Sequence, residues 1–205
     1  MANNEHQWNA IHLAAYNGQL DVVRSLLEED ESLLNVGDGP EENDWTAYHI
    51  AAAYGKMEIV KFLVEEKHMD VNELTRRKWT ALHWAAGYGH TDMTKYLVTK
   101  GVDIDSNDYK GFTALHYAAV HGHAETVAAL IEMGANMDLK DTEHENTALH
   151  WAALKGHTGT VEVLLDKKID NARILNKDRL TAYALAKKEQ KNDTVAYFQQ
   201  RRITE

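Results

Sequence analysis

Apolar residues recur along this chain in two alternating patterns, and each pattern predicts a helix. The first is a short alanine-rich run that follows a threonine or an asparagine, as at 80–86. The second is an amphipathic run with apolar residues at helical spacing, such as the one that contains Ile59, Val60 and Leu63. Polar stretches such as 102–111 then reverse the chain. We therefore predict pairs of short helices joined by polar loops.

The alanine-rich run occurs six times at a nearly fixed spacing. It reads Thr-Ala-Leu-His-aromatic-Ala-Ala at 80–86, 113–119 and 147–153, and looser copies lie at 9–15, 46–52 and 181–186. Its histidines are 12, 49, 83, 116 and 150, which gives steps of 37, 34, 33 and 34 residues. A constant period of this size is typical of a solenoid of stacked repeats.

Each copy carries residues that begin and end helices. The first threonine can accept a backbone hydrogen bond as an N-cap, and the alanines favour a helix that a neighbouring helix can approach closely. A glycine then ends this helix in five copies, at 18, 55, 89, 122 and 156. Four copies place an acid at the start of the second helix, where negative charge is favoured: Asp21, Glu58, Asp92 and Glu125. Gly101 and Gly134 are positioned to end that second helix.

This pattern resembles the ankyrin repeat, with its period of 33 and its Thr-Pro-Leu-His-x-Ala core. The resemblance covers the chain from about residue 5 to about residue 200. It implies an all-α fold, an ankyrin-repeat solenoid of helix-turn-helix units joined by β-hairpin-like loops. We expect a single ankyrin repeat domain over residues 1–205. Its repeats are expected at approximately 5–40, 41–75, 76–108, 109–141, 142–175 and 176–202.

The sequence also departs from the family pattern. Every copy has alanine where the family prefers proline at the first helical position. The step from His12 to His49 is about four residues longer than the period of the family, and we place the extra residues in the loop 35–40. Gly159 replaces the helix-start acid of the fifth repeat, and the sixth repeat has Ala184 in place of histidine and no inter-helix glycine. Because terminal repeats are atypical where their outer face meets water, we interpret both ends as caps and expect a complete repeat domain.

Twelve histidines raise the question of a metal or acid–base site. In the family the repeat histidine bonds within its own turn and to the adjoining loop. With His90, His123 and His157, which follow the inter-helix glycines, eight of the twelve are structural by position. His121 and His123 form a close pair with no third ligand arranged near them. Cysteine, a Gly-x-Ser-x-Gly motif and a Gly-rich phosphate loop are all missing, so we expect a non-enzyme without metal or cofactor.

Charge narrows the class of partner. The formal net charge is −10, and residues 1–40 and 41–75 carry −6 and −5 of it. Because an acidic chain repels a phosphate backbone, we expect no nucleic acid partner. No apolar run approaches the roughly 20 residues that a membrane span needs, so we expect no membrane partner. The missing signal peptide and cysteines favour a cytoplasmic or nuclear location, and the capped ends favour a monomer.

The resemblance to ankyrin repeats also implies where a partner binds. In the family the recognition positions are the residue before the threonine and the pair before the inter-helix glycine, on the concave face. The first position is aromatic in four repeats: Trp8, Trp45, Trp79 and Phe112. The second gives a parallel series: Tyr16, Tyr54, Tyr88 and His121. Since tryptophan and tyrosine are enriched in interface hot spots, we expect two binding ladders, with support of the hairpins as the alternative role of the tryptophans.

Two further sets of residues complete the expected site. The aromatic residues directly after the histidine, Trp84, Tyr117 and Trp151, are expected in the core. Basic side chains are expected at the hairpin tips, together with one tyrosine: Arg76, Arg77, Lys78, Tyr109 and Lys110. The preceding hairpin carries acids instead: Glu41, Glu42 and Asp44. A basic tip above an aromatic groove suits an acidic or phosphorylated peptide.

These observations lead to three hypotheses about function. The first is a non-catalytic scaffold or adaptor for protein–protein interaction, which binds a protein or peptide in the concave groove. The alternative is a regulatory or substrate-recruiting repeat region of a larger enzyme or multidomain protein. A third is that Asn72 is hydroxylated, because Asp70-Val71-Asn72 is the closest match to the Asp-Val-Asn hairpins that are modified in this family.

Overall fold

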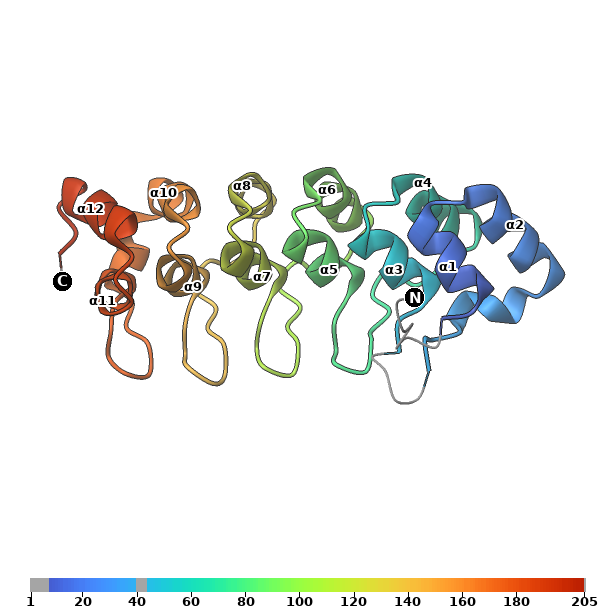
Figure 1. The fold of residues 1–205 in the computed structure, drawn as a ribbon, viewed down its shortest axis with the longest axis horizontal. Coiled ribbons are helices and arrows are strands. Elements are labelled where there is room, and N and C mark those ends of the chain that lie inside the picture. Colours follow the sequence, from blue (N-terminus) through green and yellow to red (C-terminus); the bar gives the residue numbers. More distant parts are fainter. Residues whose placement is uncertain (1–7, 40–43, 205) are drawn as a thin grey trace, which may run out of the picture.

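The computed structural model describes residues 8–39 and 44–204, and it shows six helix pairs stacked along one axis (Figure 1). The inner helices are α1 Ala10–Asn17, α3 Ala47–Ala53, α5 Ala81–Gly87, α7 Ala114–His121, α9 Ala148–Lys155 and α11 Ala182–Lys188. The outer helices are α2 Leu20–Glu29, α4 Met57–Lys61, α6 Thr91–Thr99, α8 Ala124–Glu132, α10 Thr158–Lys167 and α12 Asn192–Gln200. The predicted all-α solenoid is confirmed.

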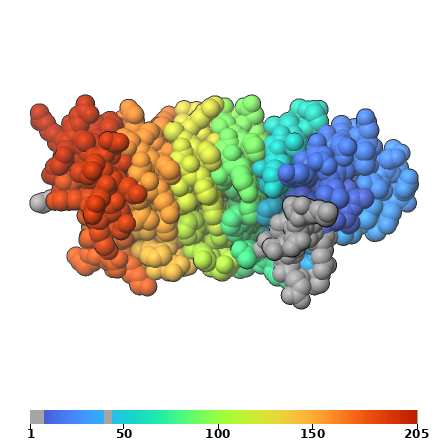
Figure 2. Space-filling model, viewed as in Figure 1, coloured from blue at the N-terminus to red at the C-terminus, as the bar shows by residue number. Residues whose placement is uncertain are grey.

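The two helix layers and the loops occupy separate levels of the molecule. Inner helices form the middle row, outer helices form a second row against them, and the long loops project from the opposite side (Figure 1). Successive repeats follow one another along the long axis, so that each contacts its neighbours in sequence (Figure 2). A solenoid of this kind presents one extended surface made by equivalent positions of every repeat.

Five of the six inner helices begin with a hydrogen bond from the backbone N–H of the residue before the helix to the repeat histidine. Thr80 precedes α5, and its backbone N–H donates to Nδ1 of His83 at 3.0 Å. Nε2 of His83 lies 3.1 Å from the carbonyl oxygen of Phe112 in the following loop. Because Nδ1 accepts, Nε2 carries the proton and donates to the next repeat. The same arrangement occurs at His12, His49, His116 and His150. The repeat histidine therefore fixes the register between neighbouring repeats.

Alanines and large apolar side chains both contribute to the core. The alanines of the inner helices are buried almost completely where α5, α7 and α9 pack side by side. Large buried side chains come from both layers: Tyr48 and Leu115 from inner helices, Leu97 and Leu130 from outer helices. The small alanines let neighbouring inner helices approach one another closely.

The inter-helix glycines leave space for a histidine that makes a second contact between neighbouring repeats. Gly122 adopts a left-handed backbone with φ +78°, and the imidazole of His157 lies directly over it. Nε2 of His157 is 2.9 Å from the carbonyl oxygen of Val120, and His90 and His123 bind the preceding repeat in the same way. The structural role predicted for these histidines is confirmed. In the sixth repeat Gln190 takes the glycine position and keeps the left-handed conformation, with φ +56°.

Inserted residues are absorbed without breaking the stack. After α4 the helix continues as a π-helical turn, η2 Phe62–Glu66. Two 3₁₀ turns, η1 Glu31–Asn35 and η3 Ile169–Arg173, follow α2 and α10. The loop placed at 35–40 is described as far as Gly39, while Pro40, Glu41 and Glu42 lie outside the described residues.

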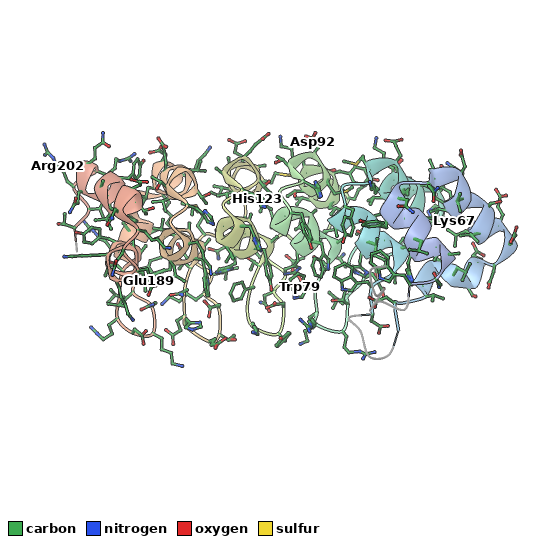
Figure 3. All side chains as sticks on the ribbon, in the orientation of Figure 1. Lys67, Trp79, Asp92, His123, Glu189 and Arg202 are labelled. Carbon is green, nitrogen blue, oxygen red and sulfur yellow. The ribbon has the colours of Figure 1, made fainter. Side chains whose placement is uncertain are left out.

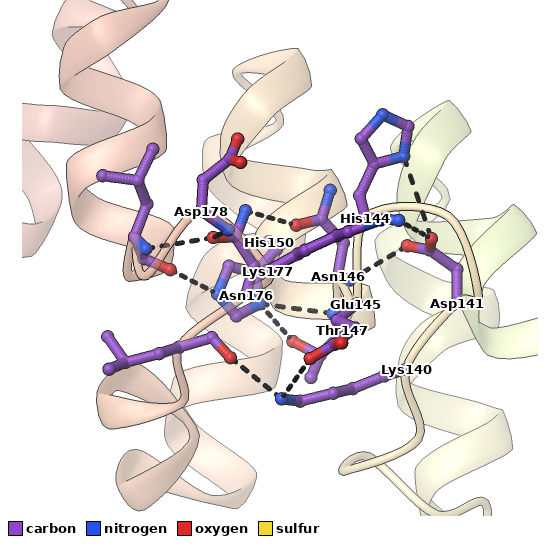
Figure 4. A network of polar contacts seen from close by, with 12 residues as sticks. Lys140, Asp141, His144, Glu145, Asn146, Thr147, His150, Asn176, Lys177 and Asp178 are labelled. Carbon is purple, nitrogen blue, oxygen red and sulfur yellow. Dashed lines mark hydrogen bonds and ion pairs between the residues drawn. The ribbon is translucent and has the colours of Figure 1, made fainter.

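The loop before the fifth repeat shows how a longer turn is held. Oδ1 of Asp141 accepts the backbone N–H groups of Glu143 and His144, at 3.0 and 2.7 Å. The side chain of Asn176, from the next loop, donates to Asn146 at 2.9 Å. These bonds join the fifth and sixth repeats into one polar network (Figure 4). Within the described part of the chain, no helix is long and apolar enough to cross a lipid bilayer.

Candidate functional site

The tyrosines that precede the inter-helix glycines form a continuous exposed ladder. Tyr16 and Tyr54 meet edge to face, with ring centroids 4.6 Å apart, and Tyr54 stacks on Tyr88 at 6.1 Å. The side chains remain 41%, 37% and 50% exposed. The ladder expected from the sequence therefore exists as a set of ring contacts on the surface. His121 lies further along the same line and is exposed.

The residues before the threonines are half-buried, and other rings join them. Trp45 and Trp79 each lie 4.0 Å from Trp84, measured between ring centroids. Tyr117 lies 4.3 Å from Trp79 and 5.2 Å from Phe112. The expected second ladder is thus a zigzag in which every other ring comes from the position after the repeat histidine.

This arrangement corrects the core assignment of Trp84, Tyr117 and Trp151. All three are half-buried, and they lie outside the main buried cluster. The buried positions of their helices are occupied by alanines, a leucine and the repeat histidine, as at Ala81, Leu82 and His83 of α5. A ring at the position after histidine therefore projects to the edge of the helix layer and contacts the loop residues.

Together these rings make one surface, which we call the aromatic strip. It consists of Trp8, Tyr16, Trp45, Tyr54, Trp79, Trp84, Tyr88, Phe112, Tyr117 and Trp151. Ring contacts connect its members in sequence from the first repeat to the fifth. The strip lies where the inner helices meet the loops, and Trp79 marks its middle (Figure 3).

Two buried carboxylates position the rings of the strip. Oδ2 of Asp108 accepts hydrogen bonds from Nε1 of Trp79 at 3.0 Å and from the hydroxyl of Tyr117 at 2.7 Å. Its other oxygen accepts the backbone N–H groups of Lys110 and Phe112. Asp141 repeats this arrangement one repeat later, with Nε1 of Trp151 at 3.0 Å. Each carboxylate thus shapes its own loop and fixes the orientation of the aromatic rings beside it.

A pocket opens in the middle of the strip. Its volume is about 320 Å³, and it is lined by Trp79, His83, Trp84, Gly87, Tyr88, Tyr117, His121 and His123. This volume lies within the range of small-molecule and side-chain sites. His123, which belongs to this lining, lies between the inner and outer helices of its repeat (Figure 3). The lining is aromatic, and glycine at 87 leaves one wall open.

The basic residues expected at the loop tips are exposed but separate from the pocket floor. Arg76 lies 3.7 Å from Asp44 of the preceding loop, so opposite charges meet between neighbouring tips. Lys78 adopts a left-handed backbone with φ +59° at the point where the loop turns. Arg77 is exposed beside them. In the next loop Tyr109 is 55% exposed, and Nζ of Lys110 lies 5.9 Å from its ring centroid.

Burial favours the neutral form of two histidines at the site. It lowers the pKa of His83 to about 4, and the nearby negative charge of Asp108 offsets only part of this effect. Burial also lowers the pKa of His121. Among the described residues no three histidine or carboxylate side chains are grouped closely enough to hold a metal ion. The site offers aromatic surface and hydrogen-bonding groups.

The sequence contains only a weak signal for the rings that our prediction assigned to the core. The position after the repeat histidine varies in size from copy to copy, whereas the following two positions are alanine in five copies. Leu13 at this position is 39% exposed, but Ile50 at the same position of the second repeat is fully buried. The exposure of this position therefore differs between repeats.

The amide of Asn72, the candidate for hydroxylation, bridges two loops. Its Oδ1 accepts the backbone N–H of Asp103 at 3.2 Å, and its Nδ2 donates to the carbonyl of Gly101. The residue is exposed. The position is consistent with a role in joining the second loop to the third.

Comparison with known families agrees with the architecture. A model described as ankyrin repeats in three copies matches residues 1–75 and 67–141, and a single ankyrin repeat matches residues 144–179. A search of curated proteins gave no significant match.

Proposed function

Because the chain belongs to the ankyrin repeat family, whose repeats generally mediate protein–protein interactions and are typically non-catalytic, we propose that it is a scaffold or adaptor that binds a protein or peptide along the aromatic strip. The observation that supports this site is the continuity of the strip across five repeats. Single apolar residues scattered over a surface are common in monomeric proteins, whereas a contiguous exposed apolar patch marks an interaction site.

The rigidity of the strip favours binding. Trp79, Tyr117 and Trp151 are held by hydrogen bonds to buried carboxylates, so their rings lose little conformational freedom when a partner arrives. The exposed tyrosines add large contact area with only two side-chain torsions each. An extended segment of a partner therefore meets a preorganised surface.

The loop tips extend the proposed surface. Arg76, Arg77 and Lys78 lie before the third repeat, and Lys110 lies before the fourth. Acidic or phosphorylated residues of a partner, flanking the segment that lies on the strip, would meet these side chains through charge-assisted hydrogen bonds. The acidic first two repeats make the charge of the surface change along its length.

Capture from native lysate tests this proposal. The wild-type protein is immobilised beside the Tyr54→Ala/Tyr88→Ala double variant, and retained proteins are identified by mass spectrometry. Val22→Ala/Ile169→Ala serves as the matched control, because both residues are similarly exposed (43% and 47%) but lie outside the strip. A partner that is lost only with the tyrosine variant supports the proposal. A partner retained equally by all three proteins moves the binding surface away from the strip.

A further inference from the structure

The pocket in the aromatic strip has the construction of a cation-binding site. Its walls include the near-parallel rings of Trp84 and Tyr88, 6.2 Å apart with an interplanar angle of 21°, and the tilted pair of Trp79 and Tyr117. The face of an aromatic ring attracts a cation that lies within about 6 Å of the ring centroid. Several rings around one small space bring their faces within that distance of a single bound group.

A formal negative charge lies directly behind two of these rings. Asp108 is 3% exposed, and its Oδ2 accepts hydrogen bonds from both Trp79 and Tyr117. A donor that is bound to a carboxylate gains electron density, which strengthens the attraction of its ring for a cation. Among the described residues Asp108 takes part in no ion pair.

The cations nearest the pocket, Arg77 and Lys155, have the smallest influence on the groups that line it. Burial lowers the pKa of His121 at its edge, which favours the neutral form of this side chain. Burial and the bond to Asp108 raise the pKa of Tyr117, and the opposing influence of Arg77 is the smallest of those acting on it. Arg76 lies against Asp44 of the preceding loop. The cation–aromatic contacts of the described chain involve rings other than those that line the pocket.

We propose that this pocket binds a weakly hydrated organic cation, a methylated ammonium or a guanidinium group carried by a side chain of the protein partner. The inference rests on the proposed function, because the cation belongs to the segment that lies along the strip. Weak hydration matters because an unmodified ammonium must give up strongly bound water to enter an aromatic pocket. The first two repeats, which precede the pocket in the stack, are acidic and favour a cationic partner.

A pair of isosteric probes tests the inference. Choline carries a trimethylammonium group, and 3,3-dimethyl-1-butanol has the same shape without the charge. Titrations are followed by the indole N–H resonances of the five tryptophans. We expect choline to shift the signals of Trp79 and Trp84, with the neutral probe at least about 10-fold weaker. Equal affinity of the two probes, or no shift at these tryptophans, would overturn the inference.

Two variants locate the binding. Tyr88→Ala removes one wall of the pocket, and we expect it to weaken choline binding at least about 5-fold. Tyr16→Ala is the matched control, because it removes a similarly exposed tyrosine of the same ladder two repeats away (41% exposed, against 50% for Tyr88). Equal losses in both variants would show that choline binds elsewhere, and the inference would fail.

Peptides then identify the source of the cation. Three peptides of one sequence carry trimethyl-lysine, arginine or lysine at the same position. Tighter binding of the trimethyl-lysine or the arginine peptide than of the lysine peptide supports the inference and names the group, whereas equal binding of all three overturns it. If a partner is captured by the wild type and lost with the Tyr54→Ala/Tyr88→Ala variant, but choline does not bind, only the cation site is overturned. If choline binds but no such partner is captured, only the proposed function is overturned.

Discussion

Acidification should destabilise the repeat stack through its buried histidines. Burial lowers the pKa of His49, His83 and His150 to about 4, and the unfolded chain has the ordinary value near 6.5. Between these two values the unfolded chain binds protons that the folded chain does not, so the free energy of unfolding falls as the pH falls. Each histidine retains its full stabilising effect above pH 6.5 and loses it on the way to pH 4.

The size of the effect follows from these values. Moving from pH 6.5 to pH 5 covers about 1.5 pH units, which costs about 2 kcal/mol for each histidine and about 6 kcal/mol for the three. We expect His83→Gln to lower the free energy of unfolding at pH 7, because the Nδ1 and Nε2 hydrogen bonds are disturbed. The same variant should lose about 2 kcal/mol less than the wild type between pH 7 and pH 5.

Urea unfolding followed by far-UV circular dichroism at pH 7, 6 and 5 measures this difference. His68→Gln provides the control, because it makes the same substitution at an exposed histidine outside the repeat motif. If His83→Gln and the wild type lose stability in parallel, the repeat histidines are not neutral in the folded chain. The reasoning about their tautomer and their role in the register between repeats would then be wrong.

Three further substitutions test the backbone and hydrogen-bond arguments through thermal unfolding. Gln190→Gly should raise the free energy of unfolding by about 1 kcal/mol, because φ at this position is +56°, and an unchanged melting temperature would contradict the strain argument. Gly122→Ala should lower it by at least about 1 kcal/mol, since a Cβ there would lie 2.7 Å from Nδ1 of His157; a neutral effect would mean that this contact yields freely. Tyr117→Phe should cost roughly 1–3 kcal/mol through the lost bond to Asp108, and a loss under about 0.5 kcal/mol would refute the anchoring role of that carboxylate.

The architecture was predictable because each repeat carries its own residues that begin and end its helices. The threonine, the histidine and the glycine act within a few residues of their own positions, so their spacing predicts where helices begin and end. Thr80, His83 and Gly89 all have the roles that this logic assigns to them. The π-helical turn of η2 was not predictable, because an extra residue in a helix end can equally be absorbed by the loop that follows.

The binding surface was predictable only in part. The exposed tyrosines follow from their place at the helix end, where the chain turns away from the neighbouring repeat. Trp84 and Tyr117 were assigned to the core because of their position directly after the repeat histidine, and their half-exposure depends on how closely the alanine-rich helices approach one another. The contact of both Trp79 and Tyr117 with Asp108 depends on the loop conformation. Such contacts between separate segments are not encoded in the spacing of any single motif.

Site-specific photocrosslinking tests the central claim most directly, because it reports where a partner lies rather than how tightly it binds. p-Benzoylphenylalanine is placed at position 88 on the strip, or at position 22 on the first outer helix, which is similarly exposed. Each protein is irradiated in native lysate and analysed by mass spectrometry. We predict a specific protein crosslinked through position 88 and none through position 22. A partner crosslinked through position 22 and not through position 88 would contradict the assignment of the aromatic strip as the binding surface.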